Sequence, residues 1–221
     1  MSLGSPESLL AVSVGVALVP LLVSVGTCYL KFSIVLSILR SGFGTQQAPS
    51  TAMIMALSLV MSLVVMRPVL DGTLERVQQL RVQQLSSQPL GAIVNEAKRV
   101  LAPWRAFLEE HCGERELQAF RELHGADVGA ERVQRDASAP QDGLPTILAA
   151  FVLSEVKKGF LTAFFLLVPF FVIDLVVSNV LVGMGLTMLS PVVVSLPLKI
   201  LLFVSTDGWL LLARNLIQSY G

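Results

Sequence analysis

Two long apolar blocks, separated by a polar insert, set the pattern of the chain. Residues 8–30 carry no charge and exceed the roughly 20 apolar residues that a membrane-spanning helix needs. The helical period continues through residues 31–40. Its apolar face consists of Phe32, Val35, Leu36 and Leu39. We expect this helix to end near Ser41, because two glycines and a proline follow closely.

A second apolar helix is predicted at Thr51–Met66, and the charged and proline-containing step Arg67–Pro68 is expected to end it. It is short for a membrane span, and its four methionines are typical of adaptable packing. The preceding loop, Gly42–Ser50, is polar, opened by glycine and closed by proline. Two interpretations stay open for this loop: a plain reverse connection, or a packed contact loop in which its two glutamines offer donors and acceptors.

The polar insert, residues 67–145, is predicted to be largely helical. Apolar residues at helical spacing in the range Ile93–Leu108 predict an amphipathic helix that bends at Pro103. A second helix is predicted around Leu117–Leu123. The polar and weakly periodic stretch Asp127–Gly143 predicts a mobile loop.

The second apolar block, residues 146–221, begins with a helix start at Pro145 and Thr146. A long apolar run is then preceded by three charged residues, Glu155, Lys157 and Lys158. Charged residues at this position are typical of a membrane interface. These charges are candidates either for a local pair, which is weak at an exposed site, or for a pair between subunits.

The run Asp174–Pro191 is the part of the chain around which we expect the rest to be organised. Asp174 is the only charge between Lys158 and Lys199, and an ionised side chain in so long an apolar span is costly unless it faces a partner or water. Helix-breaking residues follow: Gly183, Gly185 and Pro191. Irregular backbone at membrane depth survives only where protein or a cavity covers it, so this run is predicted to be an assembly or pathway element.

The last segment, residues 195–220, is predicted to be a helix with one polar stripe. At 3.6 residues per turn its polar side chains share a face: Lys199, Thr206, Asp207, Arg214 and Gln218. A polar stripe on an apolar helix normally faces protein or water. We therefore expect Lys199 and Asp207, like Asp174, to be buried against partners.

Composition agrees with an all-α, polytopic membrane protein in three segments, residues 1–66, 67–145 and 146–221. Hydrophobic residues make up 53% of the 221 and charged residues 14%, whereas about a quarter of a soluble domain is charged. The formal net charge of +0 gives no support to a nucleic-acid partner. No base precedes the first apolar run, so we expect a retained helix and not a signal peptide.

Motifs for catalysis or metal binding are missing from the sequence. The apolar segments contain no glycine-rich phosphate loop, nucleophile elbow or paired carboxylates. His111, Cys112 and His124 match no zinc spacing and lack a fourth ligand. Cys28 and Cys112 lie in unlike surroundings, so no disulfide framework is expected. We expect a protein that is not an enzyme and that holds neither metal nor other cofactor.

Four short sequences, in this order, are specific to one protein family: GTQQAP from Gly44, VIDLVV from Val172, SLPLK from Ser195 and DGW from Asp207. On these the chain resembles the FliP/SctR family, the membrane export-gate subunit shared by bacterial type III secretion injectisomes and flagella. The resemblance covers both apolar blocks and excludes the insert. The lack of a signal segment favours the injectisome branch.

The resemblance implies membrane-associated helical hairpins that assemble into a helical ring. It implies a homopentamer, joined by two smaller subunits (SctS/FliQ-like and SctT/FliR-like), in contact with lipid at the bacterial inner membrane and the periplasm above it. Unfolded secreted proteins would be the substrate. It also implies a methionine-rich gasket loop around the closed pore. That loop falls here on Met184, Leu186, Thr187 and Met188, with Gly183, Gly185 and Pro191 as its hinge. Relatives often have three adjacent methionines where this chain has Leu186, Thr187 and Met188.

The function expected is therefore that of a core subunit of the type III secretion export gate, through whose pore unfolded proteins cross the inner membrane. In that account six charged residues fix contacts within or between subunits: Glu155, Lys157, Lys158, Asp174, Lys199 and Asp207. The alternative is a proton- or ion-coupled transporter subunit, in which Asp174 titrates in a broken helix. A single acid without an intramembrane histidine is weak support for a proton relay.

Overall fold

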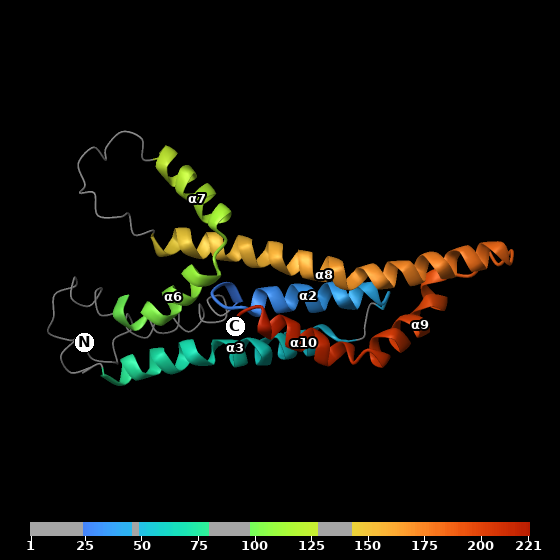
Figure 1. The fold of residues 1–221 in the computed structure, drawn as a ribbon, viewed down its shortest axis with the longest axis horizontal. Helices are drawn as coiled ribbons and strands as arrows, with labels where there is room; N and C mark the ends of the chain where they lie inside the picture. The colour runs from blue at the N-terminus through green and yellow to red at the C-terminus, as the bar shows by residue number, and fades with distance from the viewer. Residues whose placement is uncertain (1–23, 46–48, 80–97, 128–142) are drawn as a thin grey trace, which may run out of the picture. The chain divides into compact units, whose positions relative to one another are not determined.

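The structure is a computed structural model that describes residues 24–45, 49–79, 98–127 and 143–221. In these residues every regular element is an α-helix, which confirms the predicted all-α class (Figure 1). The helices are α2 (Tyr29–Gly42), α3 (Thr51–Gln79), α6 (Ala102–His111), α7 (Glu114–Asp127), α8 (Leu144–Gly183), α9 (Pro191–Ser205) and α10 (Gly208–Gln218).

The chain divides into two compact units, and the residues of α3 and α8 are shared between them. The first unit comprises Met1–Thr27 and Met66–Glu155, and the second comprises Cys28–Val65 and Val156–Gly221. The larger part of the first unit overlaps the polar insert. The second unit holds most of both apolar blocks and contains the run Asp174–Pro191.

In the first unit, α6 carries the apolar face predicted for the insert. Phe107 and Leu108 are buried, and the Phe107 ring centroid lies 5.9 Å from that of Phe151 in α8. Trp104 Nε1 donates a hydrogen bond of 2.7 Å to the Gly26 carbonyl. Pro103 stands in the first turn of α6, where a missing N–H breaks no helical bond. Residues 98–100 are helical and Leu101 forms a turn, so the helix is interrupted just before Pro103, where the bend was predicted.

The other predictions for the insert are met in part. A second helix exists as predicted, α7, although Leu123 on it is exposed. Its start is fixed by the Gly113 amide, which donates to Ser154 Oγ at 2.7 Å. The first part of the predicted amphipathic helix and most of the loop Asp127–Gly143 lie outside the described residues.

The second unit is built around α2, whose predicted apolar face is buried: Phe32, Val35, Leu36 and Leu39. Figure 1 shows α2 lying between α8 and α10. Added Cβ atoms would meet Ile34 from Gly159 and Leu167 from Gly42, so α2 and this part of α8 run parallel. The Phe32 ring meets Tyr220, beyond the end of α10, and Leu36 and Trp209 line one pocket, so α10 runs antiparallel to α2.

The predicted end of the second helix at Arg67–Pro68 is wrong, because α3 continues through Pro68 to Gln79. A proline inside a helix removes one hydrogen bond and favours a kink, and good helix formers on both sides keep the helix intact. Met66 and Arg67 supply them before Pro68, and Leu70 and Leu74 after it. The longer helix also removes the difficulty that Thr51–Met66 alone was short for a membrane span.

The predicted single helix at the C-terminus is also wrong. α9 and α10 meet at a bend of 62° across Thr206 and Asp207. Asp207 has φ 48 and ψ 43, in the left-handed region that aspartate tolerates better than most side chains. The polar stripe is therefore divided: Lys199 is buried in α9, whereas Asp207 and the polar residues after it are exposed.

Aromatic rings pack around this bend and fix it. Phe43, beyond the end of α2, has its ring centroid 4.9 Å from that of Phe170 and 5.3 Å from that of Phe203. The Phe203 ring also meets the exposed Trp209 in an edge contact at 5.1 Å. A Cβ on Gly208 would lie 2.4 Å from two carbons of the Phe203 ring, so only glycine fits there.

Among the described residues, two helices are long and apolar enough to cross a membrane: Thr51–Gln78 and Leu144–Gly183. The bent pair of α9 and α10 makes a third if it counts as one span. Within the chain, only 28% of the 18-residue apolar stretch in the first of these helices is buried, and only 17% of that in the second. Most of this apolar surface is therefore left for lipid or other subunits to cover.

Gly208→Ala is predicted to destabilise the second unit by about 1–3 kcal/mol, because the added methyl overlaps the Phe203 ring. Gly183→Ala is the matched control, since no atom lies within 4 Å of its added methyl and alanine favours a helix. Thermal unfolding of the chain in detergent measures both variants. Equal unfolding midpoints would contradict the packing described for the bend.

Candidate functional site

The end of α8 is closed by a backbone motif that depends on Gly185. The Leu186 amide donates to the Leu181 carbonyl at 2.9 Å, and the Gly185 amide donates to the Val182 carbonyl at 3.0 Å. These are the two bonds of a Schellman motif, with Gly185 as the left-handed residue at φ 75. Gly185 therefore stops the helix as the sequence predicts, because its conformation is strained for any residue with a Cβ.

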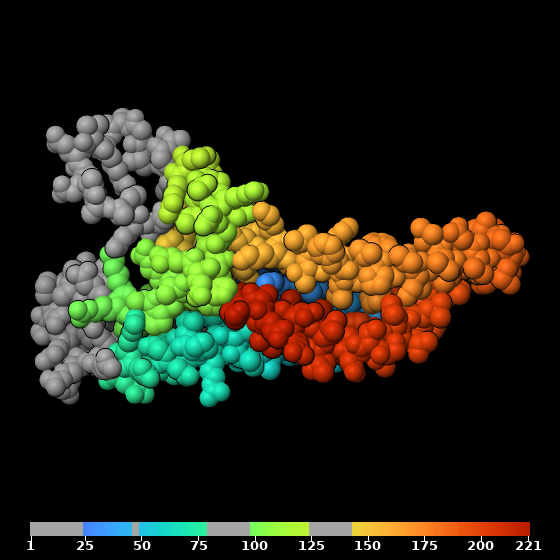
Figure 2. All heavy atoms as spheres, viewed as in Figure 1, coloured from blue at the N-terminus to red at the C-terminus, as the bar shows by residue number. Residues whose placement is uncertain are grey.

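The segment that follows Gly185, residues 186–190, is short and turns back at once. The Leu189 amide donates to the Leu186 carbonyl, and Ser190 then precedes Pro191 in the first turn of α9. All side chains from Val182 to Ser190 are exposed, with Met184 at 67% and Met188 at 98%. Figure 2 shows the end of α8 and the start of α9 uncovered on the face in view.

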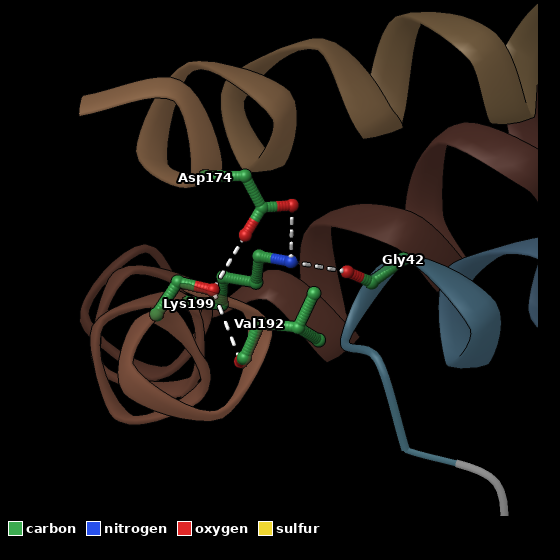
Figure 3. A network of polar contacts seen from close by, with 5 residues as sticks. Gly42, Asp174, Val192 and Lys199 are labelled. Atoms are coloured by element: carbon green, nitrogen blue, oxygen red, sulfur yellow. Dashed lines mark hydrogen bonds and ion pairs between the residues drawn. The ribbon is translucent and has the colours of Figure 1, made fainter. Parts of the chain in front are cut away.

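The base of this loop is held by a buried cation (Figure 3). Lys199 Nζ donates to Asp174 Oδ2 at 2.7 Å and to the Gly42 carbonyl at 2.9 Å. The Lys199 side chain is only 2% exposed, and the Asp174 side chain is 30% exposed. One ammonium group thus joins α9, α8 and the C-terminal end of α2.

The geometry is favourable at each partner of Lys199. The Gly42 carbonyl is among the last four of α2, which have no partner inside the helix and stand at its partially negative end. The carboxylate gains a second contact from Ser195, whose Oγ lies 2.5 Å from Asp174 Oδ1 and 3.1 Å from the Val192 carbonyl. Charge-assisted bonds of this kind are about twice as strong as neutral ones.

Two glycines let the chain come close enough for this network. A Cβ on Gly42 would lie 2.1 Å from Leu167 in α8, and one on Gly44 would lie 2.4 Å from Val192 in α9. Gly44 also has φ 77 and ends α2. The glycine end of the loop Gly42–Ser50 therefore packs as a contact loop, whereas its two glutamines lie outside the described residues.

The other predicted charged residues are not brought to the Asp174–Lys199 pair. Lys158 precedes Asp174 by 16 residues of the same helix, about 24 Å. Lys157 is exposed, and Asp207 is exposed at the bend. Glu155 is fully buried in the first unit. Their assignment to contacts between subunits stays a prediction.

Sequence reasoning missed three residues that complete the buried polar contacts. Ser195 stands four residues before Lys199, and that spacing was a usable signal because it puts both side chains on one helix face. Gly42 acts through its backbone carbonyl, for which no sequence signal exists. Lys31 is buried, donates to Ser219 Oγ at 2.6 Å, and lies 4.3 Å from the centre of the Tyr220 ring.

The contacts of this site are structural in kind. Both charges of the central pair are engaged by partners of the same chain, and the loop above them carries apolar side chains. In the part of the chain that the structure describes, no three His, Cys, Asp or Glu side chains gather as a metal site would require. The arrangement can hold a loop in place and present it to a partner.

Asp174→Asn is predicted to destabilise the chain by about 2–4 kcal/mol, because it leaves the buried Lys199 cation without its counter-charge. Lys199→Met should destabilise less, about 1–2 kcal/mol, because water reaches the partly exposed Asp174 carboxylate. The double variant should lose less than the sum of the single losses. Thermal unfolding in detergent measures this cycle, and additive losses would show that the two groups do not interact.

Comparison with known proteins identifies the chain. The model of the FliP family matches residues 12–216. The chain is 36% identical to the surface presentation of antigens protein SpaP of Shigella flexneri, over 98% of this chain and 97% of that protein. It is 37% identical to the Yop proteins translocation protein R of Yersinia pestis, over 92% and 91%, and 36% identical to the harpin secretion protein HrcR of Erwinia amylovora, over 92% and 91%. The chain therefore belongs to the FliP family of type III secretion export-apparatus proteins.

Proposed function

We propose that this chain is a core subunit of the type III secretion export gate, and that its loop Gly183–Pro191 closes the pore that admits unfolded secreted proteins. The proposal is supported by membership of the FliP family and by relatives whose names refer to translocation of Yop proteins and secretion of harpin. The gate lies in the bacterial inner membrane, or at the level of the periplasm above it once assembled. It does no chemistry on its substrate.

One observation carries the assignment of the gate to this loop. Met184 and Met188 are exposed on a turn whose two ends are fixed, by the Schellman motif at Gly185 and by the Asp174–Lys199 pair. Apolar side chains that are this exposed mark a surface that another molecule buries. A ring of copies buries it, because each loop would then meet the loops of its neighbours around the pore axis.

Sister subunits and two smaller subunits, SctS/FliQ-like and SctT/FliR-like, are the partners in this proposal, with five copies of this chain. The largely uncovered apolar helices α3, α8, α9 and α10 supply the surface for them and for lipid. The predicted subunit contacts at Glu155, Lys157, Lys158 and Asp207 belong to the same proposal.

The closure works through the physical properties of the loop side chains. Methionine is flexible and polarisable, so it fills irregular gaps and repacks at little energy. An apolar constriction blocks ions by excluding water, with no ring of charge to attract them. Leu186 contributes the same apolar bulk, and Thr187 and Ser190 are the two polar side chains of the loop. No atom of the described chain lies within 4 Å of a Cβ added at Gly183 or Gly185, so both positions have open space beside them.

Asp174 has a structural role in this account. Its carboxylate is engaged by Lys199 and Ser195 of its own chain, which is poorly suited to a site that must take up and release a proton at each transport cycle. The alternative, a proton-coupled transporter subunit, requires that carboxylate to be available to water and substrate protons in turn.

Replacing Met184 and Met188 together by alanine is predicted to raise ion leak through the assembled complex about severalfold, while secretion continues, because the apolar closure loses its bulk. Met55→Ala is the matched control, being an exposed methionine on α3 and outside the loop. Ion flux into vesicles that hold the assembled complex measures the leak. An unchanged leak in the double variant would remove the loop from the closure.

The role of Asp174 is tested by Asp174→Asn in the assembled system. We expect a lower yield of assembled complex and an unchanged pH dependence of transport per complex, because the role proposed for the carboxylate is to hold the fold together. Complex yield by native mass and secretion across a range of external pH measure the two quantities. A normal yield with a lost pH dependence would favour the proton-coupled alternative.

A further inference from the structure

An apolar pocket lies in the second unit, apart from the gate loop and the ion pair. It has a volume of about 280 Å³ and is lined by Leu36, Pro49, Met53, Ile54, Leu57 and Trp209. Nearly all of its lining is apolar, and several of these side chains are exposed. Apolar cavities of about 150 Å³ already bind small hydrocarbons. The pocket therefore fits a hydrocarbon chain.

A cation lies close, along two helices, to residues of the pocket wall. Arg40 lies four residues after Leu36 on α2, and so on the same face of that helix. Its Nη1 donates at 2.9 Å to Oγ1 of Thr51, which begins α3 two residues before Met53. A guanidinium has five N–H donors, and the bond to Thr51 leaves donors with which to bind phosphate oxygens.

The positions along α3 agree with a lipid that enters from the membrane surface. α3 is a candidate span that starts at Thr51, which places Arg40 at a polar–apolar boundary. From Thr51 to Leu57 the helix rises by about 9 Å, so the pocket extends from that boundary toward the hydrocarbon region. A molecule with an anionic head and a hydrocarbon tail matches both features at this spacing.

We propose that this pocket binds one acyl chain of an anionic glycerophospholipid, with the lipid phosphate at Arg40. A second copy of the chain fits the same place less well. The second unit contains only two acids, and Asp174 is engaged with Lys199, so the second unit of a neighbouring copy offers Arg40 only Asp207. The inference is independent of the gate, because the pocket shares no residue with the loop Gly183–Pro191.

Trp209 in the pocket wall makes the proposal measurable. The chain has two tryptophans, so a Trp104→Phe variant reports Trp209 fluorescence alone. That variant in detergent is titrated with phosphatidylglycerol brominated on its acyl chains, and separately with brominated phosphatidylcholine. Bromine quenches tryptophan only at close range. We expect saturable quenching at about one phosphatidylglycerol per chain, and weaker binding of phosphatidylcholine.

Two variants test the head and the tail of the lipid separately. Arg40→Ala should weaken phosphatidylglycerol binding about fivefold and remove the preference over phosphatidylcholine. Arg214→Ala is the matched control, an exposed cation that does not line the pocket, and should bind as before. Leu57→Phe, which narrows the pocket at a partly exposed wall, should reduce the saturable quenching by both lipids.

Native mass spectrometry of the unaltered chain counts retained lipid without relying on the tryptophan variant. Retention of about one phosphatidylglycerol, lost in Arg40→Ala and kept in Arg214→Ala, supports the site. Equal quenching by the two brominated lipids, or equal loss in the two arginine variants, overturns it. If quenching disappears when the chains associate and Trp209 becomes covered, a second copy of the chain occupies the pocket. That result overturns the lipid site.

Discussion

The second unit depends on one buried cation, the Lys199 ammonium group, and on the two groups that accept its hydrogen bonds. Lys199 stands in an apolar span, where an isolated ammonium group would be far too costly to keep charged. The Asp174 carboxylate and the Gly42 carbonyl make its burial possible, and Ser195 supports the carboxylate. Because these groups come from α2, α8 and α9, none of the three helices can shift without leaving a buried polar group unpaired.

That constraint explains how an exposed apolar loop can be held in a defined place. Residues 175–198 form a hairpin whose base is closed by the Asp174–Lys199 pair and whose tip is the turn after Gly185. The base is fixed by charge, and the side chains at the tip are exposed. A subunit that completes a closure only when its copies meet, as proposed here, needs this combination, and membership of the FliP family supplies the secretion setting.

Much of the fold was predictable, since it follows from local patterns. The buried residues of α2 repeat at helical spacing. The end of α8 near Gly185 is indicated by that glycine and by a later proline. The bend at Asp207 was not predictable in the same way. The pair Asp207–Gly208 is typical of turns, but the polar residues around it also fit a continuous helix face, which was the interpretation chosen. Pro68 failed as a stop signal because good helix formers surround it.

The candidate site was predictable as a set of residues and not as a set of contacts. The isolation of Asp174 and Lys199 in apolar sequence marks both as in need of partners. Their pairing within one chain depends on how tightly the hairpin between them returns, and tertiary packing decides that. The Gly42 carbonyl could not be predicted at all, because a backbone acceptor has no residue type. Whether the remaining charges meet across subunits is a property of the assembly.

The most direct test of the account asks what covers Met188. In assembled complexes, chains carrying Met188→Cys should be joined to one another by a short thiol-reactive cross-linker. Chains carrying Phe165→Cys, on the exposed face of α8, should react instead with a lipid-soluble maleimide. If Met188→Cys chains stay monomeric and take up the lipid-soluble reagent, the loop faces the membrane and does not close a pore.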